Sequence, residues 1–122
     1  MLKAGKRSAS AGFTLIEIIA VLLILAVLAA VAIPRYLTLV QDAQDRSLDG
    51  ALAAGYSQLS LSYAQTALAA GTPPTEAALA TAATASPPAG SFTYGFVAGA
   101  GNIAVTVTDA DGNTKNGTWT LP

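Results

Sequence analysis

The sequence predicts an α+β fold in which one long N-terminal helix packs on a small antiparallel sheet of about three strands. Two observations predict it. An apolar run near the N-terminus continues into a pattern with helical spacing, and short segments with alternating apolar residues follow near the C-terminus. A small sheet with one apolar face needs a cover, which the amphipathic half of the helix can supply.

The composition indicates one small domain and excludes several kinds of chemistry. Of the 122 residues, 52% are hydrophobic and 11% are charged, and there is no Cys or His. Disulfides, thiol nucleophiles and imidazole chemistry are therefore excluded. We expect neither an enzyme nor a resident cofactor. The net charge is −1, and duplex binding rests on clustered Lys and Arg, so we expect no nucleic-acid partner.

A segment long enough to cross a membrane lies near the N-terminus. Residues 13–33 read FTLIEIIAVLLILAVLAAVAI, with Thr14 and Glu17 as the only polar members. As a helix this segment would span roughly 30 Å, about the hydrocarbon thickness of a bilayer. Three basic residues precede it: Lys3, Lys6 and Arg7. The positive-inside rule then predicts a cytoplasmic N-terminus and an exported C-terminal part.

The start of this apolar run resembles a known processing signal. Residues 12–17 read GFTLIE, after a short basic leader and before an apolar run that ends at Pro34. This pattern, over about residues 6–36, resembles the signal shared by type IV pilins and type II secretion pseudopilins. The resemblance implies that a prepilin peptidase cuts between Gly12 and Phe13 and N-methylates Phe13. It also implies that inner-membrane assembly machinery packs copies of the chain into a helical homopolymer.

Glu17 is the only carboxylate in the run. A carboxylate at the centre of a membrane helix costs about 3 kcal/mol, and less close to the interface, where Glu17 lies. Its helical neighbours offer almost nothing to satisfy a charge: Phe13, Thr14, Ala20 and Val21. Cleavage after Gly12 would create an α-ammonium on Phe13. This amine lies four positions before Glu17, so a pair within one chain is possible. The competing pairing, which the resemblance implies, is with Glu17 of a neighbouring copy. Losing one partner of such a pair costs roughly 3–5 kcal/mol. The alternative is that Glu17 snorkels to water without a partner.

Pro34 predicts a bend within the long helix, because apolar residues with helical spacing resume beyond it. They are Leu48, Leu52, Tyr56, Leu59 and Tyr63. Gly71, followed by Pro73 and Pro74, predicts that the helix ends near Ala70. Together with Phe13 and Glu17, Pro34 is a predicted assembly residue.

A charged patch on the helix beyond Pro34 has two interpretations. Asp42 and Arg46 are four residues apart, with Asp45 and Asp49 beside them. On an isolated chain this is a solvated helix face, where such pairs contribute only a few tenths of a kcal/mol. In a filament, Asp42 and Arg46 would be subunit contacts, with Arg46 against a carboxylate of a neighbour.

The segments expected along the chain are a leader, a membrane and polymerisation helix, an amphipathic half-helix, an Ala/Thr/Pro-rich connector and a small sheet. Their bounds are 1–12, 13–34, 35–71, 72–90 and 91–122. Residues 75–83 can form a short helix within the connector. Alternating apolar residues predict three strands. The first strand contains Phe92, Tyr94 and Phe96, the second contains Ile103, Val105 and Val107, and the third contains Trp119 and Leu121.

One loop before the last predicted strand carries oxygen-bearing side chains. Asp109, Asp111 and Asn113 resemble the start of a calcium loop, but Thr120 stands where a bidentate Glu would close the site. A hairpin turn rich in Asp, Gly and Asn is the favoured interpretation. Calcium stays as the alternative, and no other metal ligands are predicted.

The favoured function is a structural subunit of a type IV pilus-like filament, built by packing of N-terminal helices after the leader is cleaved. The first alternative is a type II secretion pseudopilin, and a further one is a membrane-anchored binding module. The expected location is the bacterial inner membrane for the precursor, followed by an extracellular pilus or a periplasmic pseudopilus.

Overall fold

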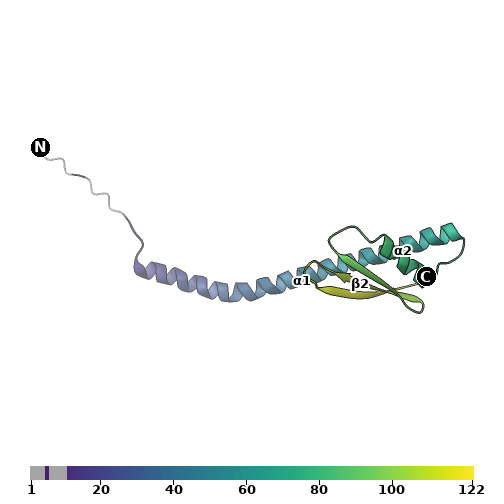
Figure 1. Ribbon diagram of the computed structural model, residues 1–122. Helices are drawn as coiled ribbons and strands as arrows, with labels where there is room; N and C mark the ends of the chain where they lie inside the picture. Colours follow the sequence, from purple (N-terminus) through teal and green to yellow (C-terminus); the bar gives the residue numbers. More distant parts are fainter. Residues whose placement is uncertain (1–4, 6–10) are drawn as a thin grey trace. The chain divides into compact units, whose positions relative to one another are not determined.

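The computed structural model describes Gly5 and residues 11–122 and has the predicted α+β architecture (Figure 1). The elements in chain order are α1 (Leu15–Ala70), α2 (Glu76–Ala85), β1 (Thr93–Ala98), β2 (Asn102–Thr108) and β3 (Thr114–Thr120). The chain divides into two compact units, Met1–Val40 and Gln41–Pro122. We call the second unit the body.

The sheet is antiparallel, with β2 in the centre, and its alternation matches the predicted strands. Across the sheet, Phe96 pairs with Val105, which pairs on its other side with Gly117. One face of β2 is fully buried, through Ile103, Val105 and Val107. This face is the centre of the body's core.

Within the body, the sheet packs along the second half of α1 (Figure 1). Leu48 and Leu59 of the predicted stripe are buried, and the other three stripe residues are partly buried against the core. Three small residues on α1 are also buried: Ala51, Gly55 and Ser62. A Cβ atom at Gly55 would lie 3.1 Å from Val105 Cγ1, so the missing side chain allows the helix to approach the sheet closely.

α2 is a second cover for the sheet, and the sequence did not predict this role. Its first turn is capped by Thr75, whose Oγ1 accepts a hydrogen bond from the Ala78 N–H at 3.4 Å. Glu76 Oε1 accepts a hydrogen bond from the Gly101 N–H at 3.0 Å, which fixes α2 to the β1–β2 turn. The buried hydrophobic core is Leu48, Ala51, Leu59, Leu79, Ala80, Ala83, Phe96, Ile103, Val105 and Val107.

The end of α1 agrees with the prediction, whereas its start does not. Gly71 has φ +67° and its N–H donates to Ala67 O at 2.8 Å, so the chain leaves the helix after Ala70. The helix begins at Leu15 and not at Phe13. The cause is the local hydrogen bonding of Thr14, described below.

Gly117 on β3 is a position of close approach, and replacing it by alanine should destabilise the body. A Cβ atom there would collide with Tyr56 Oη and lie 2.9 Å from Leu52 Cδ2, so both α1 side chains would have to move. We expect Gly117→Ala to cost about 1–3 kcal/mol of unfolding free energy. Gly95→Ala is the matched control, because its Cβ would meet only Thr106 Cβ, at 3.7 Å, and Thr106 O, at 4.0 Å. Equal melting temperatures for the two variants would contradict the prediction.

Candidate functional site

The first half of α1 is apolar and uncovered in the isolated chain. From Leu15 to Val40 every residue is exposed. α1 is the one helix among the described residues that is long and apolar enough to cross a membrane. Beyond Ile33 the helix carries the exposed Arg35, and exposed apolar side chains resume at Leu37 and at Leu39, which is 66% exposed. Such a surface requires lipid or other protein subunits around it.

Pro34 lies inside α1, as the sequence predicted. Because proline has no N–H, the carbonyl of Ala30 lacks its helical donor. One turn later, the Thr38 hydroxyl donates to Pro34 O at 3.1 Å. The helix therefore continues through Pro34 with one backbone hydrogen bond missing.

Thr14 and Glu17 form a capping box at the start of α1. The Thr14 N–H donates to Glu17 Oε2 at 3.1 Å, and the Glu17 N–H donates to Thr14 Oγ1 at 3.3 Å. The expectation that the helical neighbours of Glu17 offer almost nothing to its carboxylate was therefore wrong. The signal was present in the sequence as Thr-x-x-Glu, and it was missed because the helix was expected to start at Phe13.

The surroundings of Glu17 leave it accessible for a second interaction. Among the described residues, Glu17 Oε1 accepts no hydrogen bond and no cation pairs with the carboxylate. Phe13 is 86% exposed, and a side chain added at Gly12 would meet nothing within 4 Å. The Gly12–Phe13 peptide bond is therefore open just before the first helical turn. The basic leader residues lie outside the described residues: Lys3, Lys6 and Arg7.

The charged patch on α1 does not contain the ion pair that the spacing of Asp42 and Arg46 allows. Asp42 and Arg46 are exposed, and they do not form an ion pair with each other. Instead Lys115 Nζ lies 2.6 Å from Asp49 Oδ1, the only ion pair among the described residues. The hydrogen bond to Asp49 raises the pKa of Lys115, and Asp45 adds an electrostatic effect in the same direction. Sequence reasoning missed this link between α1 and β3 because its partners lie far apart in the chain.

The Asp109 loop has the hydrogen bonding of a hairpin turn. Asp109 Oδ1 accepts from the N–H groups of Asp111 at 2.9 Å and Asn113 at 2.8 Å, and Oδ2 accepts from the Asn113 side-chain amide at 2.8 Å. Gly112 has φ +88°, a conformation that glycine adopts readily. Both oxygens of Asp109 are thus used by the loop. No group of three acidic side chains placed to hold a metal occurs in the described part of the chain.

The turn predicts a pH-dependent contribution to stability. The side-chain hydrogen bond from Asn113 lowers the pKa of Asp109 below its ordinary value of 3.8, as do the backbone donors of the loop. A carboxyl group with a lowered pKa stabilises the folded state at pH values above its ordinary pKa. This contribution is lost as the pH falls through the lowered pKa. We expect the melting temperature of Asp109→Asn to lie below that of the parent at neutral pH, with a smaller difference in acid. A constant difference from neutral pH into strong acid would contradict this assignment.

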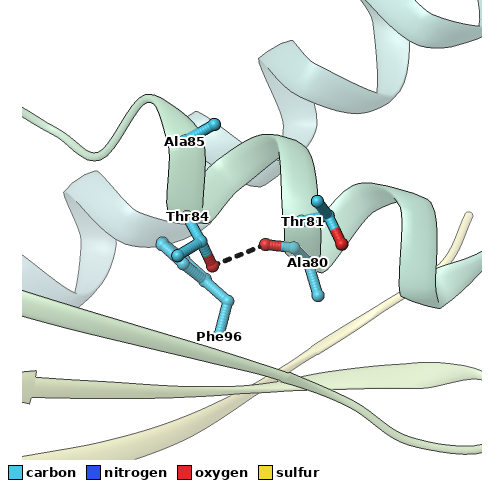
Figure 2. Close-up of a pocket in the computed structure, with 5 residues that line it drawn as sticks. All are labelled: Ala80, Thr81, Thr84, Ala85 and Phe96. Atoms are coloured by element: carbon cyan, nitrogen blue, oxygen red, sulfur yellow. Dashed lines mark hydrogen bonds between the residues drawn. The ribbon is translucent and has the colours of Figure 1, made fainter.

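A shallow hollow between α2 and β1 has no reactive groups (Figure 2). Its lining residues are Ala80, Thr81, Thr84, Ala85 and Phe96. The Thr84 hydroxyl donates to Ala80 O at 2.7 Å, and the Thr81 hydroxyl to Ala77 O at 2.9 Å. Both hydroxyl protons thus bind the helix backbone, so the candidate functional site remains the start of α1.

Comparison with known proteins gives one match, and it lies at this site. Residues 7–33 match the family model described as the prokaryotic N-terminal methylation motif. No curated protein and no solved structure matches the chain. The matched segment includes the capping box, the Gly12–Phe13 bond and most of the uncovered apolar helix. The chain therefore carries the prokaryotic N-terminal methylation motif, the signal of type IV pilins and pseudopilins, at residues 7–33.

Proposed function

We propose that the chain is a structural subunit of a type IV pilus-like filament. In this proposal a prepilin peptidase removes residues 1–12, and Phe13 is N-methylated. The inner-membrane assembly machinery then packs the apolar helices of successive copies together. The observation that carries the proposal is the uncovered apolar surface of α1 from Leu15 to Ile33, which begins at a matched processing motif.

The length of this surface supports packing between copies. Residues 15–40 form about 39 Å of helix, whereas the hydrocarbon core of a bilayer is about 30 Å thick. A lone subunit would have to tilt strongly to bury Leu37 and Leu39 in lipid. Neighbouring helices can cover Leu37 and Leu39 once the subunit leaves the membrane, so a polymer explains the apolar residues beyond Arg35.

The order of processing and assembly also follows from local chemistry. Before cleavage, the nitrogen of Phe13 is a neutral amide and cannot neutralise Glu17. Cleavage after Gly12 makes it an ammonium, which can bind Glu17 Oε1 of a neighbouring copy while Oε2 keeps its bond within the capping box. Assembly of uncleaved chains would leave Glu17 charged and unpaired in an apolar setting, which is costly.

A type II secretion pseudopilus is a second proposal, since the same motif and helix packing would serve it. A membrane-anchored binding module would instead retain the leader and remain a single membrane protein.

The decisive experiment combines mass spectrometry of the mature N-terminus with electron microscopy of the purified polymer. We expect a chain that starts at N-methylated Phe13 and is found in filaments. Long filaments on the cell surface would identify a pilus, and short periplasmic ones a pseudopilus. An intact N-terminus on a monomeric membrane protein would contradict both proposals.

A further inference from the structure

The outer face of the sheet is covered by neither helix of the body. α1 and α2 both pack on the opposite face, which holds the buried side chains of β2. Since successive side chains of a strand point to opposite faces, every second residue of β3 lies on the outer face. These are Thr114, Asn116, Thr118 and Thr120, and all four are exposed. The outer side of β3 is therefore polar, uncharged and accessible to solvent.

One segment of β3 has the acceptor pattern for N-linked sugars, which is Asn, then any residue except proline, then Thr or Ser. Asn116, Gly117 and Thr118 fit it. The two other asparagines of the chain, Asn102 and Asn113, have no hydroxyl residue two positions later. Because a three-residue pattern also arises by chance, its surroundings have to show whether the amide is available.

The side chain of Asn116 is free and has room around it. Neither Asn116 nor Thr118 forms a side-chain hydrogen bond with a described residue, whereas Asn113 Nδ2 donates to Asp109 Oδ2 at 2.8 Å. Across the sheet, Asn116 pairs with Thr106, whose own partner on β1 is a glycine. The amide of Asn116 therefore has no large side chain in its cross-strand row.

The position of β3 in the sheet leaves this segment open to an enzyme. β3 pairs with β2 alone, so its other edge is free. Asn116 and Thr118 lie on one face of the strand, two residues and about 7 Å apart. An enzyme can therefore contact both side chains of the pattern from the solvent side.

We propose that Asn116 is a site of N-glycosylation and that Thr118 is its recognition residue. The donor is a sugar activated as a phosphate or diphosphate ester. In the transfer, the bond from the anomeric carbon to the phosphate oxygen breaks, and the phosphate leaves with the electron pair. Asn116 Nδ2 bonds to the anomeric carbon and loses one proton to a base of the enzyme, so nothing is oxidised or reduced. The proposal does not depend on filament formation.

Mass spectrometry of the chain from the cells that naturally produce it tests the site. A protease that cleaves before aspartate releases residues 111–122, DGNTKNGTWTLP, from the unfolded chain. We expect this peptide to carry sugar, and its fragmentation to place the sugar on Asn116. A single sugar would indicate a nucleotide-activated donor and an oligosaccharide a lipid-linked one, and either result supports the site. An unmodified peptide, or sugar only on Asn113 or a threonine, would overturn the proposal.

Substitutions on the outer face separate recognition from folding. Asn116→Gln and Thr118→Ala should each abolish the modification, whereas Thr118→Ser should retain it. Thr120→Ala is the matched control, because Thr120 is also exposed and lies on the same face outside the pattern. None of these side chains belongs to the core, so thermal unfolding should show that every variant folds. Sugar on Asn116→Gln would overturn the site, and its loss from Thr120→Ala would overturn the role of Thr118.

Discussion

Replacing Glu17 by glutamine is expected to leave membrane insertion and cleavage after Gly12 intact but to prevent nearly all filament assembly. Glutamine can keep the capping box with Thr14, whose N–H donates to Glu17 Oε2 in the natural chain. It cannot neutralise the ammonium of a neighbouring Phe13. Stranding that charge costs roughly 3–5 kcal/mol, so yield should fall by more than about a hundredfold. Immunoblots of sheared filaments measure filament yield, and immunoblots of the membrane fraction measure insertion and cleavage.

Thr14→Ala is the matched control for this experiment. It removes the Oγ1 acceptor of the Glu17 N–H but leaves the carboxylate charge in place. Loss of a helix cap costs about 0.5–2 kcal/mol, so we expect a much smaller loss of assembly. If Glu17→Gln assembles normally and Thr14→Ala does not, the function of Glu17 is to cap its helix, and the charge-pairing proposal is wrong.

Replacing Leu59 by alanine should be among the most destabilising single changes in the body. Leu59 is 0% exposed and belongs to the core between α1 and the sheet. Deleting such a side chain costs about 2–5 kcal/mol, a large part of the total stability of a small domain. Thermal unfolding can be followed by Trp119 fluorescence. Trp119 is the only Trp of the chain, and its Nε1–H donates to Ser60 Oγ on α1 at 3.2 Å.

The control for Leu59→Ala is Leu68→Ala on the same helix. Leu68 is 86% exposed, so its truncation should change unfolding free energy by less than about 0.5 kcal/mol. This pair of variants separates burial from the change in helix propensity, which is the same for both. Similar melting temperatures for the two variants would mean that Leu59 is not in the core.

Much of the fold could be predicted because its signals are local and periodic. The spacing of Leu48, Leu52 and Tyr56 revealed the face of α1 that the sheet covers, and Gly71 revealed its end. The positions where α1 and the sheet approach each other closely could not be predicted. Gly55 and Gly117 act by lacking a side chain opposite a particular neighbour, and that neighbour is known only from the folded chain.

The core contribution of α2 was also beyond sequence reasoning. Its sequence, EAALATAATA, has no strong amphipathic pattern, because alanine fits either a buried or an exposed position. Burial of Ala80 and Ala83 depends on the nearby sheet. The connector therefore looked like a linker, although it supplies part of the core.

At the candidate site, the motif singled out Phe13 and Glu17, but it did not predict all of their contacts. Glu17 was identified because a carboxylate is unusual in an apolar run. Its hydrogen bonds with Thr14 depend on where the helix starts, and helix boundaries are poorly defined by sequence patterns. The pairing of Lys115 with Asp49 required the tertiary fold.

The placement of the basic residues has a consequence for digestion by trypsin-like proteases. Beyond residue 7 the chain has three Lys or Arg residues, and none lies between Ser47 and Thr114. Arg35 and Arg46 lie within α1, and Lys115 lies within β3. Such proteases bind extended backbone, so cleavage requires local unfolding of α1 or β3. The exposed connector and turns contain no cleavage site, and resistance to trypsin should therefore follow the stability of these two elements.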